Sequence, residues 1–104
     1  MRILLTGANG FLGSRILERL IVNNEVYITL RKDSQTNRID SIIQEARVKV
    51  FFVDENNTLE IENLFKNEEI ELIVHCATDY GKQKVFESNV LFPLEIGVKY
   101  RFVF

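Results

Sequence analysis

The residues with the clearest chemical purpose are three glycines near the start of the chain. Gly7, Gly10 and Gly13 follow one another at intervals of three, directly after the apolar run 3–5. A glycine-rich turn between a strand and a helix is typical of sites that bind dinucleotide phosphates, because the helix N-terminus offers free N–H groups and a partial positive charge. The spacing is Gly-x-x-Gly-x-x-Gly rather than Gly-x-Gly-x-x-Gly, and a turn that binds nothing is the alternative interpretation.

Each glycine has its own expected role in this turn. Gly7 can adopt the positive φ that a sharp turn requires. Gly10 lacks a Cβ, so a pyrophosphate can approach its backbone, and we expect turn dihedrals there that resist a β-branched residue. Gly13 allows the helix to lie close to the preceding strand. The motif therefore predicts a phosphate-binding turn at the N-terminus of a helix.

The apolar periodicity places this turn at the start of an α/β fold. Helix-like and strand-like segments alternate along the whole chain, and the strand-like runs are nearly continuous in apolar character, as in parallel strands covered on both faces. Strands are expected over residues 2–5, 26–30, 48–53, 72–77 and 99–104, and helices over 12–21, 39–46, 58–65 and 85–96. This order predicts a doubly wound parallel sheet of four or five strands, with the first strand central, the second and third on one side and the fourth on the other.

Composition and charge limit the classes of partner. The chain has 104 residues and a net charge of −2, which gives no general electrostatic case for binding nucleic acid or an anionic membrane. No apolar run reaches the roughly 18 residues that a membrane-spanning helix needs. The single cysteine, Cys76, cannot form an internal disulfide, so a reduced cytoplasmic protein is expected.

Several residues beyond the glycines complete a family pattern. The run Thr6-Gly7-Ala8-Asn9-Gly10-Phe11-Leu12-Gly13, then Asp54, His75-Cys76-Ala77-Thr78 and Asn89, resembles the extended short-chain dehydrogenase/reductase family. Within that family the resemblance is to the NAD-dependent epimerase/dehydratase enzymes that modify nucleotide sugars, and it covers residues 1–96. It implies a Rossmann-like dinucleotide-binding domain over 1–104, incomplete at its C-terminal end. It also implies hydride transfer between nicotinamide C4 and a sugar carbon in a full-length form.

The resemblance also implies which residues hold the cofactor. The glycines bind the pyrophosphate with backbone around Phe11 and Leu12, Asp54 contacts the adenine amino group, and Ala77 lines the ribose and nicotinamide. A solvated loop acid is the alternative for Asp54. The full set of expected cofactor-binding residues is Gly7, Asn9, Gly10, Phe11, Leu12, Gly13, Arg31, Val53, Asp54, Ala77 and Asn89. His75 is expected to be satisfied by backbone groups, and Cys76 to act as a small core residue, since no general base is identifiable beside it.

The end of the second strand bears on the choice of cofactor. Members that prefer NAD usually carry an acid there, but this chain has Arg31 followed by Lys32. A guanidinium matches a 2′-phosphate and cannot accept hydrogen bonds from ribose hydroxyls, so NADP is favoured over NAD. Arg38 adds a second charge if the loop folds back. The alternative is an ordinary basic loop in which Asp33 serves as the acid.

Two departures from the family argue that this chain alone is inactive. Family members are much longer, and their Ser or Thr and their Tyr-x-x-x-Lys pair follow the fifth strand. Tyr80 and Lys84 have that spacing but lie in another segment, so we assign no catalytic residue. The stretch 89–104 is also shorter than in the family, as a deletion or frameshift would make it. We therefore expect a truncated sheet whose open edge self-associates; a stand-alone nucleotide-binding or redox-sensing module and an inactive gene remnant are the alternatives.

Overall fold

A five-stranded parallel sheet forms the centre of the fold. The computed structural model describes residues 1–53, 58–76 and 99–103. The strands are β1 (Arg2–Thr6), β2 (Glu25–Leu30), β3 (Val48–Phe52), β4 (Leu72–Cys76) and β5 (Lys99–Val103). Their order is β3-β2-β1-β4-β5, and every neighbouring pair is parallel. The expected sheet, with the first strand central and the order reversing beside it, is confirmed.

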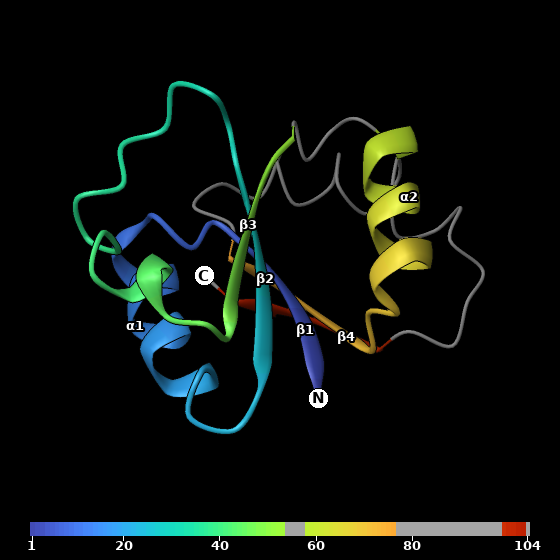
Figure 1. Cartoon of the computed structure of the whole chain (residues 1–104), viewed down its shortest axis with the longest axis horizontal. Helices are drawn as coiled ribbons and strands as arrows, with labels where there is room; N and C mark the ends of the chain where they lie inside the picture. The colour runs from blue at the N-terminus through green and yellow to red at the C-terminus, as the bar shows by residue number, and fades with distance from the viewer. Residues whose placement is uncertain (54–57, 77–98, 104) are drawn as a thin grey trace.

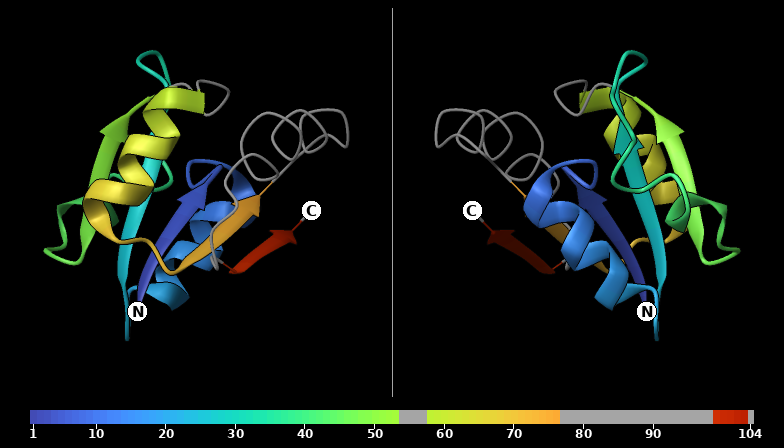
Figure 2. Two further views of the ribbon diagram at one scale, coloured as in Figure 1. Left: turned by 90° about the vertical axis from the view of Figure 1, so that its right-hand side faces the viewer. Right: turned by 90° about the vertical axis from the view of Figure 1, so that its left-hand side faces the viewer.

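Helices cover both faces of this sheet. The α-helix α1 (Phe11–Leu20) and the short 3₁₀ helix η1 (Ile42–Gln44) lie on one face, and α2 (Thr58–Glu68) lies on the other (Figures 1 and 2). This is the doubly wound arrangement that the alternating pattern predicts. No helix in the described part of the chain has the length and apolar character needed to cross a membrane.

Alternating strand residues build an apolar layer on each face. Toward α1, Ile3 and Leu5 of β1 cluster with Val26, Ile28 and Leu17, and all are almost fully buried. Complete burial of one such side chain stabilises the fold by about 1.5–3 kcal/mol. The opposite layer holds three residues that are also buried: Leu4, Tyr27 and Ile73. Tyr27 stacks there on Phe51, with ring centroids 6.0 Å apart. Both faces of the central strands are therefore apolar, as their continuous hydrophobic runs indicate.

The expected helix over 39–46 is wrong in its extent. Ile39 is fully buried, but only Ile42–Gln44 are helical, and Ala46, expected on the buried face, is exposed. The segment is too short to overcome the cost of helix nucleation, and its β-branched residues have weak helix propensity. The strand boundaries shift by one residue at several ends. The expected helix over 85–96 lies outside the described residues.

Backbone contacts around Gly7 determine how closely these elements pack. Gly7 has φ +73°, and a Cβ there would lie 2.4 Å from the carbonyl oxygen of Cys76 in β4. A Cβ on Gly13 would lie 1.9 Å from the carbonyl oxygen of Gly7. The expected positive φ at Gly7 and the expected close approach at Gly13 are both confirmed. Gly10 differs, because φ −80° and ψ 173° are ordinary extended values, so the special dihedrals expected there are absent.

Gly13→Ala tests this close packing. The added methyl group overlaps backbone atoms that cannot move away cheaply, so we expect the free energy of unfolding to fall by about 3 kcal/mol. Urea denaturation followed by circular dichroism measures the change. Gly10→Ser is the matched control: a Cβ there would meet only the carbonyl oxygen of Gly7, at 3.4 Å, and serine is a good N-cap residue. Equal stability of the two variants would contradict the packing role of Gly13.

Candidate functional site

The glycine turn lies at the carboxyl end of β1 and leads directly into α1. The Gly10 N–H donates to the carbonyl oxygen of Gly7 at 3.1 Å, which closes the turn. Gly10 is the N-cap residue of α1, and the Ser14 N–H donates to its carbonyl oxygen at 3.0 Å. The motif thus forms the strand, turn and helix N-terminus that its spacing predicts.

The N-terminus of α1 is open to an anion. Gly10 has no side chain to cap the first turn, and that turn contains no acidic residue. The backbone N–H groups of Phe11, Leu12 and Gly13 cannot find partners within the helix, because its first residues lack a preceding turn. The Phe11 side chain is 67% exposed, with the Arg15 guanidinium 5.2 Å from the centre of its ring. By contrast α2 carries Glu60 in its first turn, an acid that already compensates the helix dipole.

A buried polar pair lies beneath the turn. Thr6 and His75 are register partners on β1 and β4, and the Thr6 hydroxyl forms a hydrogen bond with Nδ1 of His75. Both residues are buried. We expected backbone groups to satisfy His75, so the threonine side chain is a partner that the sequence analysis missed. Two polar residues near the carboxyl ends of neighbouring parallel strands, Thr6 at the end of β1 and His75 one position before the end of β4, were the available signal.

Cys76 occupies the last position of β4, against Gly7. Its side chain is half-buried, and burial raises the pKa of the thiol to about 11. The thiol is therefore protonated at neutral pH, and a protonated thiol is a poor nucleophile. This state agrees with the packing role expected for Cys76.

The loop after β2 is folded rather than extended. The Arg31 N–H donates to the Ser34 hydroxyl at 2.9 Å, and the Ser34 N–H donates back to the Arg31 carbonyl oxygen at 3.0 Å. The Asn9 amide nitrogen of the glycine turn donates to the Gln35 carbonyl oxygen at 3.1 Å. On the other side, the Val53 N–H donates to the Leu30 carbonyl oxygen at 3.1 Å, which places Val53 beside the start of the loop.

Eight expected cofactor-binding residues therefore lie in or beside the glycine turn and the loop after β2. They are Gly7, Asn9, Gly10, Phe11, Leu12, Gly13, Arg31 and Val53. The other three, Asp54, Ala77 and Asn89, lie outside the described residues, as do Tyr80 and Lys84. Ser34 and Gln35, which shape the loop after β2, were not identified from the sequence.

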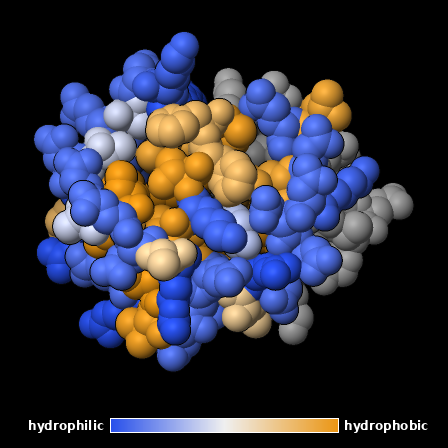
Figure 3. All heavy atoms as spheres, in the orientation of Figure 1, coloured by the Kyte–Doolittle hydropathy of each residue, from blue (hydrophilic) through white to orange (hydrophobic). Residues whose placement is uncertain are grey.

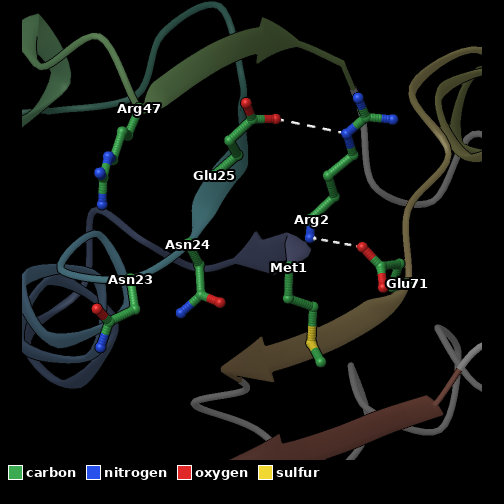
Figure 4. Close-up of a pocket in the computed structure, with 7 residues that line it drawn as sticks. All are labelled: Met1, Arg2, Asn23, Asn24, Glu25, Arg47 and Glu71. Atoms are coloured by element: carbon green, nitrogen blue, oxygen red, sulfur yellow. Dashed lines mark hydrogen bonds and ion pairs between the residues drawn. The ribbon is translucent and has the colours of Figure 1, made fainter.

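A cavity at the opposite, amino end of the strands has a different character. It has a volume of about 400 Å³ and is lined by Met1, Arg2, Asn23, Asn24, Glu25, Arg47 and Glu71 (Figure 4). The Arg2 guanidinium is ion-paired, since its Nε lies 3.4 Å from Glu25 Oε2, and the Arg2 backbone N–H donates to the Glu71 carboxylate at 3.1 Å. Arg47 donates to the Val22 carbonyl oxygen at 2.7 Å, just after α1. The polar side chains around this cavity therefore contact neighbouring elements: the Arg2 guanidinium is ion-paired and the Arg47 guanidinium donates to a backbone carbonyl oxygen.

Comparison with known proteins agrees with this geometry. The model of the family described as "NAD dependent epimerase/dehydratase family" matches residues 3–95. A CDP-abequose synthase from Salmonella muenchen is 30% identical over 101 residues, which cover 91% of this chain and 31% of that protein. The chain thus spans about a third of the length of this relative.

Solved structures support the fold. A leucoanthocyanidin reductase–NADPH complex from Vitis vinifera superposes with a TM-score of 0.71 at 19% identity, over 98% of this chain and 32% of that one. A dTDP-glucose 4,6-dehydratase from Bacillus anthracis in complex with NAD superposes with a TM-score of 0.68 at 21% identity. The superposition covers 86% of this chain and 29% of that one. Because the family model matches most of its length, the chain belongs to the NAD-dependent epimerase/dehydratase family.

Proposed function

We propose that this chain binds a nicotinamide dinucleotide across the carboxyl edge of its sheet, with the pyrophosphate on the glycine turn. The observation that carries the proposal is the open N-terminus of α1, uncapped and without an acid, directly after Gly10. Backbone N–H groups and the helix dipole favour an anion at such a place. Family membership supports the proposal, as do the NAD and NADPH named in the complexes of two structural neighbours.

Each part of the edge has a role in this proposal. The N–H groups of Phe11 and Leu12 donate to pyrophosphate oxygens, which the missing Cβ of Gly10 allows to come close. Asp54, with Val53 beside it, contacts the adenine in this proposal, Ala77 lines the cofactor near the ribose and nicotinamide, and Asn89 is a further cofactor-binding residue. The chemistry that the dinucleotide supplies when bound is hydride transfer at nicotinamide C4.

The preferred form of the cofactor in this proposal is NADP. Arg31 follows the last residue of β2 and its side chain is exposed. A guanidinium there donates charge-assisted hydrogen bonds to the 2′-phosphate of NADP. The ribose hydroxyls of NAD need a hydrogen-bond acceptor, and a guanidinium has none. Lys32 is exposed beside it and adds positive charge.

The substrate class in this proposal is a nucleotide sugar, bound by a longer form of the protein. CDP-abequose synthase and the dTDP-glucose dehydratase support this class, and each is about three times the length that this chain matches. The chain of 104 residues supplies the dinucleotide-binding part in this proposal and does not catalyse by itself. Tyr27 is buried under the α2 face and is out of reach of a substrate.

Gly10→Val tests the phosphate-binding turn. The valine side chain would occupy the space that the pyrophosphate needs, so we expect NADP binding to fall below detection in isothermal titration calorimetry. The extended dihedrals at Gly10 accept valine, and the poorer N-cap costs about 1 kcal/mol of stability, so the circular dichroism spectrum should stay close to that of the wild type. A folded variant that binds as the wild type does would contradict the proposed pyrophosphate site.

Arg31→Asp tests the cofactor preference. Loss of a charge-assisted contact worth about 1.5–3 kcal/mol predicts NADP binding about 10- to 100-fold weaker, with NAD binding unchanged or improved. Arg19→Asp is the control, because it makes the same charge change in the last turn of α1. A wild-type chain that binds NAD more tightly than NADP would show that Arg31 does not select the cofactor.

The absence of catalysis is tested with the wild-type chain. Positioned acid–base groups typically contribute about 10²–10⁴-fold to a rate, and we assign none to this chain. We expect no change in nicotinamide absorbance at 340 nm when the chain is mixed with NADPH or NAD and CDP- or dTDP-linked hexoses. Turnover that Tyr80→Phe abolishes would assign the acid–base role to Tyr80 and refute this part of the proposal.

A further inference from the structure

The Asn9 side chain makes a contact that the phosphate-binding role of its turn does not explain. Its amide nitrogen donates to the Gln35 carbonyl oxygen at 3.1 Å, across 26 residues of sequence. Among the described residues, this is the one hydrogen bond that joins the glycine turn to the loop over 31–38. We propose that Asn9 is a positioning residue that holds this loop against the glycine turn and so sets the preference for a dinucleotide with a 2′-phosphate.

Contacts with other described residues hold the rest of the loop at its two ends. At the start, the reciprocal hydrogen bonds of Arg31 and Ser34 close a turn. At the end, Thr36 donates to Asp40 at 2.7 Å, and Ile39 is fully buried in the α1-side core. Gln35 lies between these anchors and is exposed, so the hydrogen bond from Asn9 holds the middle of the loop.

The loop carries three cations that are free to meet a phosphate. Arg31, Lys32 and Arg38 are exposed, and none forms an ion pair with another described residue. Long cationic side chains on a loose loop lose conformational freedom when they bind an anion, which weakens binding. A loop that Asn9 already holds in place loses less conformational freedom on binding, so it should bind the phosphate more tightly. The effect is specific to the 2′-phosphate, because NAD offers these cations no phosphate at that position.

This inference rests on the proposed dinucleotide site, and a pair of asparagine variants separates the two. Asn9→Ala removes the hydrogen bond, and Asn37→Ala removes an exposed asparagine of the same loop that has no hydrogen bond to another described residue. Loss of one neutral hydrogen bond predicts NADP binding about three- to tenfold weaker in Asn9→Ala, measured by calorimetry. NAD binding should change by less than about twofold, and Asn37→Ala should match the wild type for both.

Two further measurements show whether Asn9 acts through the loop. In the cofactor-free chain, Asn9→Ala should speed amide hydrogen exchange in residues 33–37 and leave the β1 amides unchanged. In an Arg31→Ala background, adding Asn9→Ala should change the ratio of NAD to NADP dissociation constants by less than it does in the wild type, because the residues act together.

Each outcome bears on one of the two claims. Equal weakening of NAD and NADP, or unchanged exchange in 33–37, would overturn the positioning role while leaving the dinucleotide site intact. An Asn37→Ala variant that behaves like Asn9→Ala would also overturn it. A wild-type chain that binds neither dinucleotide would overturn the proposed function and, with it, the effect of Asn9 on cofactor choice.

Discussion

The candidate site depends on the close packing of backbone around Gly7. A Cβ on Gly7 would lie 2.4 Å from the carbonyl oxygen of Cys76, and a Cβ on Gly13 would lie 1.9 Å from the carbonyl oxygen of Gly7. These two contacts leave no room for side chains between β4, the turn and α1. Because α1 is held this close, its first turn lies beside the carboxyl end of β1, after the turn formed by residues 7–10. The position of the N–H groups in its first turn is thus a consequence of packing between glycine backbones.

The sheet beneath the turn carries an unusual polar row. Thr29, Thr6 and His75 are register neighbours on β2, β1 and β4, and all three are buried. Burying a polar group costs free energy unless it is hydrogen-bonded, and the Thr6–His75 hydrogen bond offsets part of that cost. The pair joins β1 to β4, where the strand order reverses and the crevice of such folds opens. The Thr29 hydroxyl has no hydrogen-bond partner among the described residues.

The sequence predicted what depends on periodicity and on glycine chemistry. Apolar runs identified the five strands and their order, and the glycine spacing identified the turn and its two tight contacts. It did not predict that residues 39–46 would be mostly irregular. Ile39, Ile42, Ile43 and Ala46 have the spacing of one helix face, but only Ile39 is fully buried. The Thr6–His75 and Asn9–Gln35 hydrogen bonds were also missed. They join residues 69 and 26 positions apart, and such pairings follow from the folded geometry rather than from local pattern.

The two ends of the sheet differ in whether their charged side chains form ion pairs. For the binding of a phosphate, this difference matters more than the net charge of −2. At the amino end, Arg2 lies between Glu25 and Glu69, and Arg47 donates to carbonyl oxygens just after α1. Exposed ion pairs of this kind each stabilise the fold by about 0–1 kcal/mol.

Between the two ends of the sheet, hydrophobic side chains gather over β3 in the middle of the face in Figure 3, and they carry no charge. At the carboxyl end, Arg31, Lys32 and Arg38 are unpaired with described residues and lie on the side of the uncapped α1 N-terminus. Because Asp33 and Asp40 belong to the same stretch, residues 31–40 carry a net charge of +1 on a chain that is negative overall. Charges are screened beyond about 8 Å in physiological salt, so these cations act on a phosphate only at short range.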